Sequence, residues 1–256
     1  MKKLYLPLIK KNNRYFHTSR RAAEMIKYAS NAFLALKISY INEIANLCDK
    51  VGADVHVVSK AMGQDGRISP KFLHPGPGYG GSCFPKDTKA LVASGRKYQT
   101  PIHTIEAAIK TNKNQKLKMV DKLLKLMEGD LANKTVAVLG LAFKPQTDDV
   151  RDAASLVIIP ELIDKGASVH AYDPIATKNF KSYYKNISYF DCWQDAVLGV
   201  DGVIILTEWN EFRGMDLDDL KSRMAQPVVL DAKNILSIKK LQSLNFIYDN
   251  VGRSSI

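Results

Sequence analysis

The chain has 256 residues, 46% of them hydrophobic, and a formal net charge of +11 at pH 7. That length and hydrophobic content allow one or two folded cores, which excludes a mainly disordered protein. Its three cysteines, Cys48, Cys83 and Cys192, lie far apart without a C-x-x-C pair, which argues against a disulfide framework or a zinc site and predicts reduced thiols in the cytoplasm.

The first residues, MKKLYLPLIKKNN, combine lysines with a short apolar run that Pro7 interrupts. A secretory signal peptide has a longer apolar segment, and no later stretch approaches the roughly 20 apolar residues of a membrane span. We therefore expect neither a secretory leader nor a membrane partner.

A long helix is predicted over Arg21–Lys50, because this stretch contains no glycine or proline. Its apolar side chains occupy more than one face, so the helix needs neighbours on several sides. We expect one neighbour to be a second copy of the chain, which would make a homodimer. Lys27 and Asn31 lie one turn apart on this helix, and such a polar pair amid apolar residues either finds partners or faces a ligand.

A turn and a short helix ending near Gly63 are predicted next, from VGADVHVVSKAMG. The glycine- and proline-rich residues 66–81 must form a loop. Pro85 fits the first turn of the following helix, which continues over Lys86–Ser94 and which Gly95 is predicted to close.

Cys83 stands between the glycines of GYGGS and this helix start. The unpaired N–H groups and the dipole of a helix N-terminus favour a thiolate, and Lys86 adds positive charge nearby. Cys83 is therefore the candidate nucleophile, whereas Cys48 and Cys192 are interpreted as packing residues. Asp87 lies one turn beyond Cys83, on the same face of the helix. It is a candidate general base or water anchor, or else a first-turn carboxylate that complements the helix dipole.

Two further helices are predicted, over Pro101–Asn112 and Asn114–Glu128. The densest basic stretch, Ile109–Lys125, falls here, and its apolar residues recur with helical spacing, which indicates an amphipathic helix with a lysine-coated solvent face. No nucleic-acid-binding motif accompanies it, so nucleic acid is not an expected partner. The positive potential would help to attract a small anionic ligand.

From residue 131 onward, short apolar strands alternate with helices, beginning with a buried strand at Thr135–Leu139 that runs into Gly140. This alternation predicts an α/β fold with a doubly wound parallel sheet over residues 131–256, after an all-helical region. The predicted strands are ASVHAYDP, GVIILT, PVVLDAK and NFIYDN, and the predicted helices are Ser155–Lys165, a helix around Asp195 and Leu217–Met224.

The turn after the first strand lacks the G-x-G-x-x-G spacing that lets a pyrophosphate approach the backbone, so no dinucleotide site is expected in this sheet. Phe143 and Lys144 follow that strand at its carboxyl end, where such sheets bind ligands. We expect them to hold a nucleotide in a different way.

Five stretches occur in this order: AAEMIKYASNAFLALKISYINEIA, DGRISPKFLHPGPGYGGSCFPKDTKAL, VAVLGLAFKPQTDDVRDAAS, VHAYDP and ILTEWNEF. Together they resemble the nucleotide-sugar dehydrogenases of the UDP-glucose/GDP-mannose dehydrogenase family, and within it the members that act on UDP-glucose. The resemblance covers essentially the whole chain. Members that act on GDP-mannose tend to have phenylalanine in place of Tyr79 and leucine in place of Phe84, and those that act on N-acetylated UDP-sugars tend to have histidine in place of Ser82.

The resemblance implies a four-electron oxidation of the sugar C6 alcohol of UDP-glucose to a carboxylate with NAD, in which the thiolate of Cys83 traps the aldehyde. It implies that Lys27 and Asn31 stabilise the developing oxyanion and that Asp87 assists proton transfer or positions water. It also implies that Lys86 and Arg151 approach the bound NAD. The substrate-binding residues that it implies are Arg67, which reaches the partner subunit's site, and Phe72, Leu73, His74, Gly76, Gly78, Tyr79, Gly80, Phe143, Lys144 and Lys233.

Two features depart from the family pattern. Lys233 stands where an arginine is usual near UDP, and lysine lacks the bidentate fork. Residues 1–20 resemble only the last piece of the amino-terminal NAD-binding domain and its linker, so we expect the chain alone to be inactive. The predicted division is therefore 1–20, a helical dimerisation domain 21–130 and a UDP-binding domain 131–256. The alternatives are a catalytically silent UDP-sugar-binding or dimerisation protein, and a dehydrogenase for another nucleotide sugar.

Overall fold

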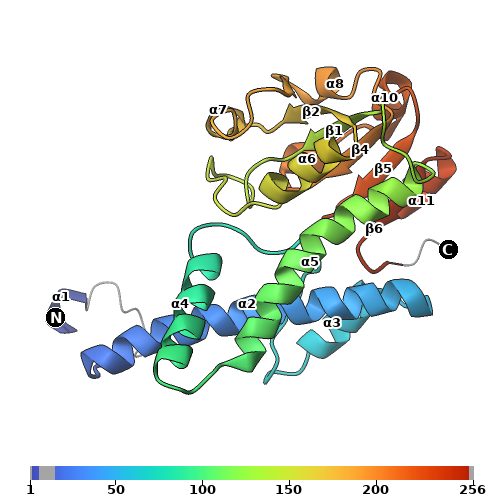
Figure 1. Cartoon of the computed structure of the whole chain (residues 1–256). Coiled ribbons are helices and arrows are strands. Elements are labelled where there is room, and N and C mark those ends of the chain that lie inside the picture. Colours follow the sequence, from blue (N-terminus) through green and yellow to red (C-terminus); the bar gives the residue numbers. More distant parts are fainter. Residues whose placement is uncertain (1, 6–14, 254–256) are drawn as a thin grey trace.

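A computed structural model of the protein describes residues 2–5 and 15–253. A layer of long helices lies below a parallel sheet in the view of Figure 1. Helix α1 spans Lys2–Tyr5. The prediction of a linker in residues 1–20 falls partly on residues 1 and 6–14, which lie outside the described residues.

The longest helix, α2 (Arg20–Val51), confirms the prediction of a helix over Arg21–Lys50. It begins after Ser19, whose side chain accepts a backbone hydrogen bond, and it ends at Gly52, whose φ of +72° is the left-handed conformation that favours glycine. Helix α3 (Val55–Gly63) follows directly and contacts α2.

Two predicted helix boundaries are wrong. Helix α4 (Phe84–Lys97) continues through Gly95, because a Cβ there would lie 2.6 Å from the carbonyl oxygen of Thr100, and glycine permits this close packing. Helix α5 (His103–Leu126) is continuous where two helices were predicted, since the sequence between them contains no glycine or proline to end a helix.

The sheet is parallel throughout, with the strand order β3-β2-β1-β4-β5-β6 of doubly wound nucleotide-binding folds. The predicted α/β class is thus confirmed. Strand β3 was not predicted, because two residues are too short for a strand pattern to show. The strands are β1 (Thr135–Leu139), β2 (Ser168–Tyr172), β3 (Ser188–Tyr189), β4 (Gly202–Ile205), β5 (Val228–Asp231) and β6 (Ile247–Asn250).

Helices cover both faces of the sheet. Val136 and Val138 of β1 pack in one hydrophobic cluster with α5 and α6, whereas Ala137 and Leu139 pack in another on the opposite face, as the alternation of strand side chains requires. The shorter helices are α6 (Ser155–Asp164), α7 (Thr177–Phe180), α8 (Trp193–Ala196), α9 (Asn210–Arg213), α10 (Leu217–Arg223) and α11 (Ile238–Ser243). None of the described helices is both long and apolar enough to cross a membrane.

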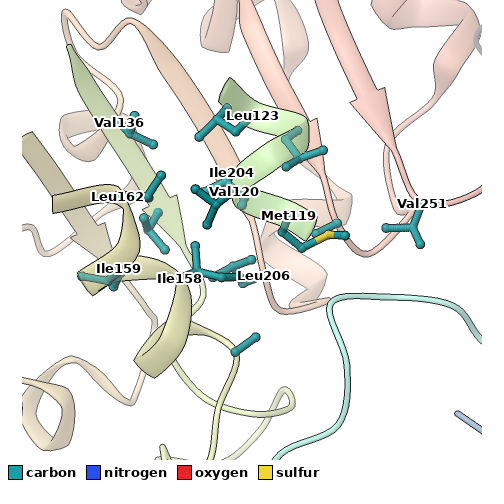
Figure 2. Packing of buried hydrophobic residues seen from close by; sticks show 14 of the residues in the cluster. Met119, Val120, Leu123, Val136, Ile158, Ile159, Leu162, Ile204, Leu206 and Val251 are labelled. Carbon is teal, nitrogen blue, oxygen red and sulfur yellow. The ribbon is translucent and has the colours of Figure 1, made fainter. Parts of the chain in front are cut away.

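Helix α5 joins the helical layer to the sheet. Figure 2 shows Met119, Val120 and Leu123 of α5 beside Ile158 of α6 and Ile204 of β4. The same buried cluster continues into α2 and α3, so the two predicted domains share one hydrophobic core. The loop between α3 and α4 is thereby held at the carboxyl edge of the sheet. The boundary near residue 130 stays a prediction, and α5 packs on both sides of it.

Candidate active site

Asp87, in the first turn of α4, is fully buried and binds two side chains of α2. Lys27 Nζ donates a hydrogen bond to Asp87 Oδ2 at 2.5 Å, and Asn31 Nδ2 donates to the same oxygen at 2.6 Å. Lys86 Nζ donates to the other carboxylate oxygen. The structure therefore brings together four predicted site residues from two segments that are more than 50 residues apart in the sequence.

The electrostatic setting of Asp87 bears on its role. Burial alone would raise the pKa of this carboxyl group, but the hydrogen bonds from Lys27, Lys86 and Asn31 outweigh burial and hold the pKa well below its usual range. Asp87 is thus ionised at neutral pH, whereas an efficient general base has a pKa near the working pH. The geometry favours an anchor that orients the two lysines and the amide.

Cys83 is exposed at the position before α4, while Cys48 is buried and Cys192 is partly buried. The side chain of Cys83 makes no capping hydrogen bond to the helix, and its Sγ lies 3.8 Å from Ser82 Oγ. Of the three thiols, the predicted nucleophile is therefore the most exposed one.

Two cations lie near this thiol. The pKa of Lys86 is raised mainly by its hydrogen bond to Asp87, and the pKa of Arg151 mainly by its hydrogen bond to Asp149. Both side chains line the same cavity as Ser82, the residue directly before Cys83, so their positive charges face the surroundings of this thiol.

Buried amide side chains hold the loop that precedes Cys83. Asn112 of α5 accepts a hydrogen bond from the Tyr79 N–H at 2.7 Å and donates to the Tyr79 carbonyl at 3.0 Å. Asn42 of α2 accepts from the Gly76 N–H at 2.8 Å, and Gln115 of α5 donates to the Gly76 carbonyl at 3.0 Å. These amides were not predicted as site residues: their helical spacing is visible in the sequence, but those on α5 lie in a lysine-rich stretch that indicates a solvent-facing surface.

Two glycines bring this loop against the sheet. A Cβ at Gly80 would lie 2.5 Å from the Asp152 carbonyl oxygen, and one at Gly81, where φ is +79°, would lie 2.8 Å from the Phe143 ring. Lys144 Nζ lies 5.3 Å from the centre of the same ring. The predicted residues Gly80, Phe143 and Lys144 thus share one site at the carboxyl end of β1.

Lys233, which follows β5, approaches the same loop. A Cβ at Gly76 would lie 3.6 Å from Lys233 Nζ, and this ammonium is 2.7 Å from Glu208 Oε2. Burial raises the pKa of Glu208, but the charge of Lys233 and its hydrogen bond lower it further, so the net shift is downward. The departure from arginine at this position therefore still places a positive charge at the loop.

The remaining predicted residues are more loosely connected to this cluster. The Arg67 side chain is 91% exposed and pairs with Asp65 at 2.6 Å, and His74 is exposed. Phe72 packs edge-on against an aromatic ring of α4. Leu73 is buried in the hydrophobic core, so its side chain is a packing group.

The turn after β1 is unsuited to a dinucleotide pyrophosphate, because its amides are already bound. The backbone N–H groups of Leu141 and Ala142 both donate to Oδ2 of the buried Asp173, at 2.8 and 3.0 Å. A Cβ at Gly140 would lie 2.6 Å from the Thr207 side chain, so this glycine serves close packing within the sheet domain. A pyrophosphate binds to free backbone N–H groups, and this turn leaves neither the Leu141 nor the Ala142 N–H group free for one.

A cavity of about 710 Å³ adjoins Ser82 and contains Lys86 and Arg151 in its wall. A third cation there, Lys116 of α5, was missed by the sequence analysis, which treated its lysine-rich stretch as a solvent-facing surface. Lys116 is only 6% exposed and donates to the Asp152 carbonyl at 2.7 Å. Within the described residues, no group of three or more histidine, cysteine or acidic side chains is arranged to hold a metal ion.

Two family models match the chain in sequence order. The model of the UDP-glucose/GDP-mannose dehydrogenase family, central domain, matches residues 21–114, and that of the UDP-binding domain of the same family matches residues 137–238. The first match contains α2, α3, the glycine loop and Cys83, and the second contains the sheet as far as α11.

Proteins similar to this chain include UDP-glucose dehydrogenases. The chain is 46% identical to UDP-glucose 6-dehydrogenase of Rhizobium meliloti over 99% of its own length and 58% of that protein, and 47% identical to UDP-glucose 6-dehydrogenase TuaD of Bacillus subtilis over 93% and 52%. A solved UDP-glucose dehydrogenase from Pyrobaculum islandicum superposes with a TM-score of 0.83 at 35% identity, over 93% of this chain and 52% of that one. The chain thus spans about half the length of the curated relatives it matches.

Proposed function

The chain belongs to the UDP-glucose/GDP-mannose dehydrogenase family, and from this membership we propose that it carries the central and UDP-binding domains of a UDP-glucose 6-dehydrogenase. The observation that carries the proposal is the exposed Cys83, one turn from a buried Asp87 that binds Lys27 and Asn31. This arrangement suits an enzyme that attacks a carbonyl carbon with sulfur and stabilises the resulting oxyanion.

In the proposed reaction, the C6 alcohol of UDP-glucose loses a hydride and a proton and becomes an aldehyde. The Cys83 thiolate adds to the aldehyde carbon to form a thiohemiacetal, and loss of a second hydride gives a thioester. Water then displaces the sulfur, which releases the carboxylate of UDP-glucuronate and regenerates the thiol. NAD, when bound, accepts the hydrides, and we propose that Lys86 and Arg151 lie beside it.

Lys27 and Asn31 have donors to spare for the oxyanion. A lysine ammonium has three N–H donors and an asparagine amide has two, and Asp87 occupies one on each side chain. We infer that the others point at the substrate oxygen and that Asp87 fixes both groups before substrate arrives. Preorganised donors of this kind stabilise charge that develops in a transition state.

The nucleotide is proposed to bind between the glycine loop and the sheet, where Gly80, Phe143, Lys144 and Lys233 converge. The exposed ammonium of Lys144 supplies positive charge for a diphosphate, Lys233, which is paired with Glu208, adds hydrogen-bond donors beside it, and the Phe143 ring supplies an apolar surface. The family model that matches residues 137–238 is described as a UDP-binding domain, which supports this placement.

We also propose a homodimer built on α2. Ile26, Phe33, Tyr40 and Leu47 are each between 46% and 59% exposed, and they recur every seventh residue, so they form one apolar stripe. Closed two-fold pairing of such a stripe is the commonest way for a chain to bury it. The exposed Arg67 would then be available to the partner's site, as the family resemblance implies.

The first test is calorimetry on the 256-residue chain. We expect binding of UDP and UDP-glucose, no detectable NAD binding, and no NADH from UDP-glucose plus NAD. Cys83→Ser should bind UDP like the wild type, because the thiol is not part of the proposed nucleotide contacts. Absence of UDP binding would reject the proposal, and steady NADH formation would show that this chain alone provides a complete cofactor site.

A chimera separates the enzyme from a silent UDP-sugar-binding protein. The part of the Rhizobium meliloti relative that this chain does not match would be joined to the chain's amino terminus, and NADH formation from UDP-glucose would be followed by absorbance. Activity that Cys83→Ser abolishes supports the proposed function. A chimera that binds both NAD and UDP-glucose without forming NADH favours the silent binder.

A further inference from the structure

We propose that Lys116 is a positioning residue, which holds residues 151–153 against the glycine loop and so sets the surroundings of Cys83. The inference rests on the proposed function only in treating Cys83 as the reacting thiol. Lys116 lies outside every residue set that the sequence resemblance assigns to substrate or cofactor.

The first observation is a polar face on α5. Asn112, Gln115 and Lys116 are spaced three and four residues apart, so they share one side of the helix, and all three are buried. Each binds main chain far away in the sequence: the two amides hold Tyr79 and Gly76 of the glycine loop, and Lys116 holds the segment before α6. One rigid helix therefore fixes both sides of the contact between loop and sheet.

The second observation is where the Lys116 bond ends. Its acceptor, the Asp152 carbonyl oxygen, is the atom that a Cβ at Gly80 would approach to 2.5 Å. The neighbouring Arg151 carbonyl accepts a hydrogen bond from the Gly81 N–H at 2.7 Å. A shift of this segment would consequently move both glycines, which directly precede Ser82 and Cys83.

The third observation is that Lys116 has no ion-pair partner in the described part of the chain. The pKa of Lys116 is lowered to about 8, mainly by burial; the charge of Asp152 opposes this lowering and that of Lys89 adds to it. A buried ammonium whose hydrogen bond goes to a carbonyl and that has no ion pair in the described residues is costly, so packing alone does not account for it. The charged or titratable groups around it are Lys86 and Lys89 of α4, Arg151 and Asp152 before α6, and Tyr183 across the cavity.

A consequence is pH dependence near the pKa of Lys116. Below that pH, the ammonium makes a charge-assisted hydrogen bond to the Asp152 carbonyl. Above it, the neutral amine donates more weakly, the loop is held less firmly, and one positive charge near Cys83 is lost. Both the binding of UDP and the reactivity of Cys83 should weaken relative to a chain that keeps its charge.

The test compares wild type, Lys116→Arg and Lys116→Met, with Lys113→Met as an exposed control on the same helix. Alkylation of Cys83 by iodoacetamide is followed by peptide mass spectrometry between pH 6 and 10, and UDP affinity by calorimetry. Because both chains carry the same thiol and differ only in whether the residue at position 116 loses its charge at high pH, the ratio of wild type to Lys116→Arg reports the effect of Lys116. We expect this ratio to stay constant below about pH 7 and to fall at least threefold above about pH 9.

In Lys116→Met, we expect UDP affinity at pH 7 to fall about tenfold, the size expected for one hydrogen bond to a charged group, while Lys113→Met resembles the wild type. A rate ratio that stays constant up to pH 10 overturns the inference. So does a Lys116→Met chain whose melting temperature is lower but whose UDP affinity and Cys83 reactivity equal those of the wild type. If Lys116→Met fails to fold, the arginine comparison still decides. If wild type binds no UDP, the proposed function fails, and the alkylation ratio still tests Lys116.

Discussion

Replacing Asp87 by asparagine tests whether the buried carboxylate organises the active site. The change keeps the size of the side chain but removes the charge that binds Lys27, Asn31 and Lys86. Removing one partner of a buried ion pair costs about 3–5 kcal/mol, largely because the other charge stays buried. Here the Lys27 and Lys86 side chains are 58% and 63% exposed and regain water when released, so we expect about 2 kcal/mol for the loss of Asp87.

Thermal unfolding measures this loss. A chain of this size loses roughly 2–4 °C in melting temperature per kcal/mol, so Asp87→Asn should melt about 4–8 °C below the wild type at pH 7. The matched control is Asp65→Asn, because Asp65 pairs with the exposed side chain of Arg67 and its loss should leave the melting temperature unchanged.

The pH dependence has a defined sign. The pKa of Asp87 is lowered in the folded chain, so its stabilising contribution is complete above the ordinary carboxyl pKa of about 4 and is lost as the pH falls further. The difference between wild type and Asp87→Asn should therefore be constant from about pH 8 to 5 and shrink below about pH 4. Equal melting temperatures at pH 7, or a difference that grows in acid, would refute the reasoning.

Three other predictions follow from exposure and contact. Iodoacetamide should label Cys83 well before Cys48, because Cys48 is buried and its pKa is raised by burial and by neighbouring carboxylates; equal labelling of the folded chain contradicts this. Gly80→Val should weaken UDP binding at least about tenfold by calorimetry, since its Cβ would lie 2.5 Å from a backbone oxygen, whereas Gly66→Ala, with nothing within 4 Å, should bind normally. Phe33→Glu should convert the dimer into a 28.5 kDa monomer in sedimentation, and an unchanged dimer would exclude α2 as the interface.

Much of the fold could be predicted, because its signals are local and repeated. The lack of breakers in α2 and the alternation of strands and helices after residue 131 each depend on neighbours in the sequence. The errors occur where tertiary contacts decide: Gly95 stays inside α4 because another segment packs against it, and β3 exists only as a partner of β2.

The candidate site was predictable in part for the same reason. The one-turn spacings of Lys27 with Asn31 and of Cys83 with Asp87 were visible, and the structure adds that Lys27 and Asn31 both bind Asp87. Lys116 could not be recognised, because its partner is a carbonyl group, and every residue has one. A buried polar side chain that binds main chain leaves no second side chain in the sequence to point to it.

The way backbone amides are used at this site bears on how the proposed nucleotide would bind. In the turn after β1, the N–H groups of Leu141 and Ala142 are bound by Asp173, so the sheet presents side chains instead of amides. In the glycine loop, the hydrogen bonds of the described residues engage the N–H groups of residues 76, 79 and 81 and leave those of Gly78 and Gly80 without a protein acceptor. Oxygen acceptors of a ligand at this edge would therefore meet loop amides on one side and the lysines of the sheet on the other, which is a different solution from the glycine-rich turn of a dinucleotide site.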